Sequence, residues 1–148
     1  MKKIIAIAFV SILALSGCSL LGEVHSSLEY ADNATEYVNT VKGFANEVPA
    51  LAQDAVTNTE ARQSLEKELQ QMKTEIEEFN ATEPPQIAET IHEKIVASNQ
   101  QLSDGIELYL NNIEKGQIDP KALEESEIMQ TIDQITSLSE QIEKIGNE

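Results

Sequence analysis

Residues 65–79 read LEKELQQMKTEIEEF and decide the fold. Their apolar side chains recur in steps of four, three, four and three, at Leu65, Leu69, Met72, Ile76 and Phe79. This spacing places them on one line along a helix, which is the seam along which helices pack against one another. Glutamate and lysine occupy the other faces of the helix, where they remain hydrated. The stretch therefore predicts a helix that packs against other helices.

The residues before this seam predict a longer helix with a broad buried face. Ser26 and Glu29 form a capping box, which predicts the helix start. Pro49 predicts a kink or a split, or the first residue of a second short helix. Apolar residues beyond Ser26 recur every seven positions in three neighbouring columns. The columns are Tyr30, Tyr37, Phe44 and Leu51; Ala31, Val38, Ala45 and Ala52; and Ala34, Val41, Val48 and Ala55.

Breaker residues divide the rest of the chain into further helical segments. Thr57-Asn58-Thr59-Glu60 is a second capping box, and Pro84-Pro85 separates the second segment from the third. Lys115-Gly116 predicts a helix end, and Asp119-Pro120 predicts a new start with aspartate as the N-cap. The third segment carries an apolar stripe at Ile87, Ile91, Ile95, Leu102, Ile106, Tyr109 and Ile113. The last carries one at Ile128, Ile132, Ile135, Leu138, Ile142 and Ile145.

Four helical segments with short connections predict an all-α fold, an up-down antiparallel helical bundle over residues 26–148. Helices of roughly 20–30 residues would be about 30–45 Å long, at a rise of 1.5 Å per residue. The rival arrangement is a pair of extended helical hairpins that dimerises. The strict seam of residues 65–79 is typical of such pairing, so a homo-oligomer stays open.

The N-terminus has the features of a secretory signal peptide. Met1-Lys2-Lys3 is basic, and residues 4–14 are apolar except for one serine. This apolar run of about 11 residues is shorter than the roughly 20 that a membrane-spanning helix needs. We therefore expect residues 1–17 to be a signal peptide and residues 18–25 to be a short tether before the bundle.

The signal segment ends in Leu15-Ser16-Gly17-Cys18, which resembles a bacterial lipobox. The resemblance implies cleavage between Gly17 and Cys18, and a diacylglyceryl group, with palmitate among its acyl chains, on the cysteine sulfur. Two acyl chains anchor a protein stably, whereas one does so only marginally. The chain holds one cysteine, so an internal disulfide is excluded, and lipidation gives the thiol a use. The predicted location is the extracytoplasmic face of the cell membrane.

The strong negative charge excludes some partners. The full chain carries a net charge of −16, and removal of residues 1–17 takes away Lys2 and Lys3, leaving −18. Nucleic-acid binding needs a basic surface, and so does electrostatic adhesion to anionic lipid. We therefore expect the protein to bind no nucleic acid and to be held at the membrane by its lipid. The acidic residues are interpreted as solvated helix faces, with cations or a basic partner as the alternative.

Few residues suggest chemistry. Glu89 and His92 form one Glu-x-x-His on a helix, a weak metal-site candidate, because di-iron bundles use two such pairs plus two further glutamates. We expect His92 at the border of its apolar stripe as a solvated or helix-flanking histidine, with no metal or other cofactor. No nucleophile elbow or phosphate loop occurs, so we expect no catalytic residues and no enzyme. The column of Tyr30, Tyr37 and Phe44 predicts core, with a groove for an apolar ligand or a partner helix as the alternative.

Across nearly its whole length the sequence resembles an uncharacterised family of small lipoproteins from Bacillus-type, single-membrane bacteria. The similarity lies in residues 15–22, 27–30, 75–80, 83–85 and 135–138. It implies a location and a fold, and it assigns no activity. We expect a membrane-anchored, non-enzymatic interaction or accessory module that binds another envelope protein. The alternative is a binder of a small apolar ligand or of cations, through the bundle interior or the acidic face.

Overall fold

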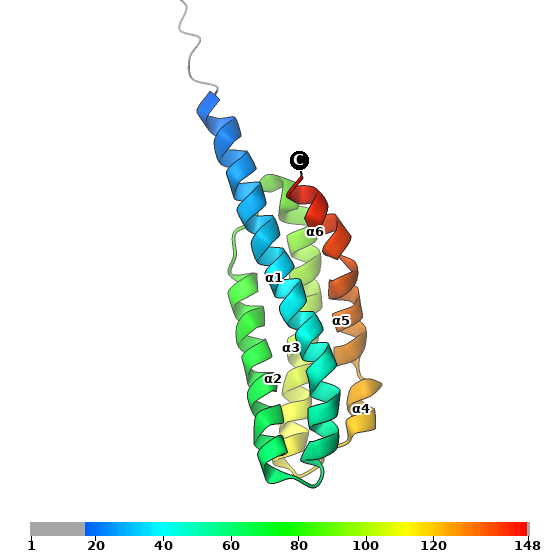
Figure 1. The fold of residues 1–148 in the computed structure, drawn as a ribbon. Coiled ribbons are helices and arrows are strands. Elements are labelled where there is room, and N and C mark those ends of the chain that lie inside the picture. Colours follow the sequence, from blue (N-terminus) through cyan, green and yellow to red (C-terminus); the bar gives the residue numbers. More distant parts are fainter. Residues whose placement is uncertain (1–16, 148) are drawn as a thin grey trace, which may run out of the picture.

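The chain folds into an all-α bundle of four antiparallel columns (Figure 1), as predicted. The computed structural model describes residues 17–147, with side chains from residue 25 onward, so residues 1–16 of the predicted signal peptide 1–17 lie outside this range. No strand occurs between residues 17 and 147. The elements are α1 (Gly17–Ala55), α2 (Thr59–Asn80), η1 (Gln86–Ala88), α3 (Glu89–Glu114), α4 (Pro120–Glu124), α5 (Glu127–Ser137) and α6 (Ser139–Ile145).

The apolar seams meet in one core between the columns. α1 packs against α2 on one side and against α4, α5 and α6 on the other, while α3 packs against α2 and α5. The seam of α2 is buried as predicted, and so are most of the columns of α1. Ile87 is an exception, because the third stripe was predicted one position out of register at its start. Its side chain is 47% exposed, and the neighbouring Ala88 is buried instead.

α1 begins earlier than its sequence suggested. Ser26 was predicted to cap the helix, but it lies inside a helix that already includes Gly17. An N-cap residue needs extended backbone dihedrals, and no proline before Ser26 interrupts the helix. α1 therefore has 39 residues and a length of about 58 Å, against about 33 Å for the 22 residues of α2. Its N-terminal part extends beyond the ends of the other columns (Figure 1).

Pro49 does not split α1, which continues through it to Ala55. Proline removes one backbone hydrogen bond from a helix interior. Val48 and Ala52, on either side of it, are fully buried against the neighbouring columns. This packing holds the helix together across the proline.

The predicted N-cap of α2 was wrong by one residue, whereas the predicted end of α3 was correct. The N-cap of α2 is Asn58 and not Thr57, because the Asn58 side chain accepts hydrogen bonds from the backbone N–H groups of Glu60 and Ala61. The end of α3 is as predicted. Gly116 has a left-handed φ of 74°, and its N–H donates to the carbonyl of Ile113, as is typical of a Schellman motif.

The fourth column is three helices where one was predicted. The first break follows α4, where Ser126 is extended and its hydroxyl donates to the carbonyl of Leu123 over 2.6 Å. The second follows α5, where the hydroxyls of Thr136 and Ser137 donate to the carbonyls three residues earlier. Serine and threonine compete in this way with the helical hydrogen bonds of the backbone. The apolar stripe nevertheless stays on one side, because Ile128, Ile132, Ile135, Ile142 and Ile145 are all buried.

Candidate functional site

The predicted lipid-attachment residue lies at the start of the projecting part of α1. Cys18 is the second residue of this helix, and its side chain lies outside the described part. Ser27, nine residues on, is the first buried side chain of the described part, so the helix rises about 14 Å from Cys18 to the bundle. The residues predicted to form a tether are therefore helical. Within residues 17–147, no helix is both long and apolar enough to cross a membrane.

A buried aromatic cluster joins α1, α2 and α3 near the end of the bundle from which α1 projects. The hydroxyl oxygen of Tyr30 lies 3.2 Å from Nδ1 of His92. The imidazole stacks on the ring of Phe79, with centroids 5.2 Å apart. Phe79 in turn stacks on Tyr37 at 4.3 Å. One aromatic side chain from α2 thus packs between residues of the two neighbouring helices.

A second polar contact continues this cluster toward the middle of the bundle. The Tyr37 hydroxyl donates to the Oδ1 of Asn99, which is fully buried. The Asn99 amide nitrogen donates over 2.8 Å to Oδ1 of Asn80 at the end of α2. Burial raises the pKa of Tyr30 to about 12 and also raises that of Tyr37. Both phenols are therefore neutral near pH 7, and their hydroxyls serve as hydrogen-bonding groups in the core.

The structure does not bring Glu89 and His92 together as a metal site. Glu89 is exposed in the first turn of α3, whereas His92 is 8% exposed and faces Tyr30 and Phe79. The prediction of a solvated histidine was therefore wrong. In the described part of the chain, no three or more His, Cys, Asp or Glu residues gather so that they could hold a metal ion.

The buried histidine should make stability depend on pH. Burial lowers the pKa of His92 below its ordinary value of 6.5, and the charge of Glu93 acts in the opposite direction. The unfolded chain then binds this proton at a higher pH than the folded chain does. We expect the free energy of unfolding to keep its full value above pH 6.5 and to decrease as the pH falls below it. Urea unfolding at pH 7.5 and 5.5 measures the difference.

The matched variants are His92→Gln and His25→Gln. The second replaces the other histidine, which is exposed. His92→Gln should reduce the difference between pH 7.5 and 5.5, whatever it does to stability at pH 7.5, whereas His25→Gln should preserve it. Equal pH dependence in all three proteins would contradict this assignment.

A groove runs along the surface between α1 and α2, beside the aromatic cluster. It consists of two adjoining hollows of about 340 and 180 Å³, which share Thr40 and Glu75. We call the two together the α1–α2 groove. Side chains that line the first hollow include Glu36, Tyr37, Glu78 and Phe79. Those that line the second include Phe44, Glu47, Glu68 and Met72.

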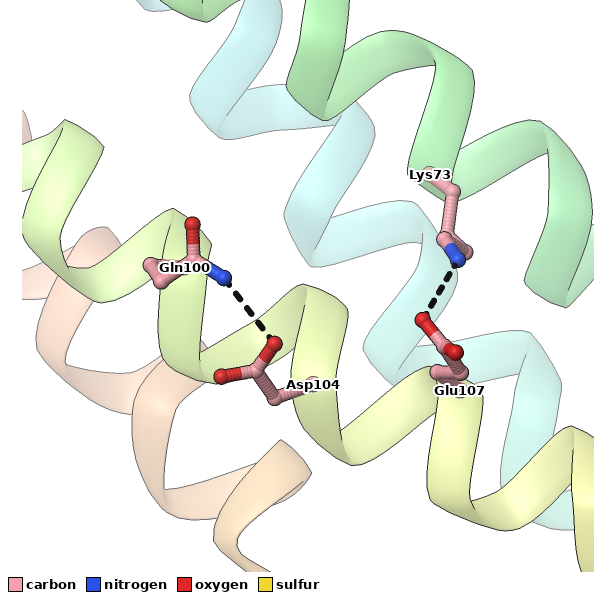
Figure 2. A network of polar contacts seen from close by, with 4 residues as sticks. All are labelled: Lys73, Gln100, Asp104 and Glu107. Carbon is pink, nitrogen blue, oxygen red and sulfur yellow. Dashed lines mark hydrogen bonds and ion pairs between the residues drawn. The ribbon is translucent and has the colours of Figure 1, made fainter.

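The lining of this groove is acidic and contains no lysine or arginine. Lys73 lies on α2 within the same stretch, but its ammonium pairs with Glu107 of α3 at 3.2 Å. Figure 2 shows this side chain directed across to α3, where Gln100 and Asp104 form a further hydrogen bond. The groove carboxylates make no ion pair with any described residue. Tyr37, Phe44, Met72 and Phe79 also line the groove, but each is almost fully buried, so they contribute only a narrow apolar strip to a mostly polar surface.

The groove and the polar core contacts were not foreseen from the sequence. Glutamates from two helices line one groove, and the pairing of helix faces that brings them together is a property of the tertiary structure. Asn99 and His92 could have been found, because they continue the four-three spacing of the α3 seam: Ala88, His92, Ile95, Asn99, Leu102, Ile106, Tyr109 and Ile113. A polar residue in a seam signals a buried hydrogen bond.

The chain is similar to one family and one curated relative over most of its length. A family model described as "Family of unknown function (DUF6376)" matches residues 30–145. The relative is the "Uncharacterized lipoprotein YybP" of Bacillus subtilis (strain 168), 40% identical over 147 residues, which cover 99% of each chain. No solved structure matches the chain.

Proposed function

This chain belongs to the DUF6376 family, and on that premise we propose that it is a lipoprotein whose helical bundle binds another component of the cell envelope. In this proposal Cys18 carries the lipid, after cleavage of residues 1–17. The bundle is held at the extracytoplasmic face of the cell membrane. It is an interaction or accessory module and not an enzyme.

One observation carries the anchoring part of the proposal. The similarity to the B. subtilis lipoprotein covers 99% of this chain, so it extends into the segment that contains Leu15-Ser16-Gly17-Cys18. The charge of the mature chain supports the same conclusion, because an acidic surface is repelled by anionic lipid. A covalent lipid is then the feature that can hold this molecule at a membrane.

The arrangement of titratable groups favours binding over catalysis. Tyr30 and His92 are hydrogen-bonded to each other within the core and line neither hollow, and the hydroxyl of Tyr37, which lines the groove, is engaged by Asn99. Paired acid and base groups of an active site need to face a common substrate. The groove instead offers a long surface of one charge sign, which suits recognition of another chain by electrostatic complementarity.

Crosslinking in intact cells tests the interaction role. We expect formaldehyde crosslinking and affinity purification of the tagged full chain to enrich a small set of envelope proteins. The control keeps residues 1–25 and carries an unrelated acidic helical domain of similar size. Because both proteins share the same anchor, recovery of the same proteins with the control would contradict a specific role for the bundle.

A further inference from the structure

We propose that the α1–α2 groove binds a lysine- or arginine-rich segment of a protein partner, lying along the two helices. This inference rests on the proposed interaction role and names the chemistry of the partner.

The charge of the groove lacks an ion-pair partner among the side chains that the structure describes. Five glutamates line the two hollows: Glu36, Glu47, Glu68, Glu75 and Glu78. Lys67 adjoins Glu68 in sequence but is exposed and lines neither hollow. Lys73, two residues from Glu75, is held by Glu107 on another face. Carboxylates concentrated along one channel attract cations and raise the association rate of a basic partner.

A narrow apolar strip at the bottom of the groove adds to the attraction by charge. Tyr37 and Phe79 line the first hollow, and Phe44 and Met72 line the second, with only a few per cent of each residue exposed. Lysine and arginine bury their methylene groups along apolar surface while the charged end reaches a polar group. Here the stems would touch this strip, and the charged ends would meet the glutamates on either side.

The length of the groove corresponds to a short extended peptide. On α1 the lining residues run from Asn33 to Glu47, and on the other side they run from Glu68 on α2 to Thr82, two residues past the end of that helix. The α1 stretch rises by about 21 Å at 1.5 Å per residue. An extended chain covers about 3.3–3.6 Å per residue, so about six residues fill the groove.

Other occupants fit the described residues less well. A metal ion needs three or more ligands close together, and residues 17–147 offer no such group. A second copy of this chain would bring like charges into contact. Nucleic acid would be repelled by the same carboxylates. A basic polypeptide satisfies both the charge and the length.

The experiment measures binding of a fluorescein-labelled hexa-arginine peptide to the lipidated mature protein in phosphatidylcholine nanodiscs. Fluorescence anisotropy at low salt gives the dissociation constant. The groove variant is Glu36→Gln, Glu75→Gln and Glu78→Gln combined. The matched control combines Glu114→Gln, Glu125→Gln and Glu143→Gln, which are exposed, line neither hollow and change the net charge equally.

We expect saturable binding to the wild type, weakened at least tenfold by the groove variant and less than threefold by the control. Equal weakening by both variants would show attraction by net charge alone and would overturn the proposal, as would absence of saturable binding to the wild type. Purified protein is used, so a negative result would reject this occupant of the groove. Lipid attachment and the crosslinking result would be unaffected by it.

Discussion

Replacing Cys18 by alanine is expected to abolish lipid attachment and normal processing of this chain. If residues 15–18 are a lipobox, the sulfur of Cys18 accepts the lipid, and the methyl group of alanine cannot do so. Each buried methylene of an acyl chain contributes about 0.8 kcal/mol to membrane binding, so two chains together dominate the affinity. Incorporation of labelled palmitate should therefore fall to background, and the mature chain should no longer begin at residue 18.

A second variant is needed to test whether loss of the lipid releases the bundle from the membrane, because an uncleaved signal segment could itself hold the precursor there. Replacing residues 1–18 by an ordinary cleaved secretory signal should send residues 19–148 into the soluble fraction. Ser19→Ala is the matched control for Cys18→Ala, since it changes the adjacent residue and leaves Leu15-Ser16-Gly17-Cys18 intact. Unchanged palmitate labelling of Cys18→Ala would refute the assignment of this residue.

The architecture could be predicted because apolar spacing reports directly on which helix faces are buried. The α2 seam and the stop at Gly116 were both predicted correctly, because each depends on local chemistry. Asp119 caps α4 as predicted, but two other N-caps were less predictable. Ser26 and Thr57 have suitable side chains, but the backbone takes extended dihedrals at Asn58 and remains helical at Ser26. Which of several capable residues caps a helix depends on where the helix is held by tertiary contacts.

The close approach of α3 and α5 could not be predicted from the sequence either. Gly105 lies in the middle of α3, where glycine is unfavourable by propensity. A Cβ atom built at this position would lie 2.8 Å from Cγ1 of Ile128 on α5. The absence of a side chain therefore lets α5 pack closely on α3. The sequence shows that position 105 is glycine, but only the packing of the helices explains why a side chain would not fit there.

The buried face of α3 was predicted wrongly at the start of the helix for a related reason. His92 and Asn99 occupy seam positions but are polar, and a search for apolar spacing selected Ile87 and Ile91 instead. Ile87 is largely exposed and Ile91 is half-buried, whereas His92 and Asn99 are buried with hydrogen-bond partners. Their burial depends on tyrosines 62 residues away in the sequence. Such long-range pairing cannot be read from local composition.

Asn99 is therefore expected to be the polar residue on which stability depends most. Asn99→Leu retains the approximate volume of the side chain but leaves the Tyr37 hydroxyl without its acceptor in the core. An unsatisfied buried polar group costs about 1–3 kcal/mol. The Asn80 side chain also loses a donor, although it is half-buried and can bind water. We expect a loss of about 2–4 kcal/mol in the free energy of unfolding, measured by urea denaturation of the soluble form with residues 19–148.

The double variant separates this hydrogen bond from a general effect of substitution in the core. Tyr37→Phe alone should cost about 1–2 kcal/mol, because Asn99 loses its donor. With both changes, no buried hydroxyl is left without an acceptor. Tyr37→Phe with Asn99→Leu should then be at least 0.5 kcal/mol more stable than the sum of the single effects predicts. Strict additivity would mean that the two side chains do not interact. Asn111→Leu, at an exposed position of the same helix, is the control and should change stability by less than about 0.5 kcal/mol.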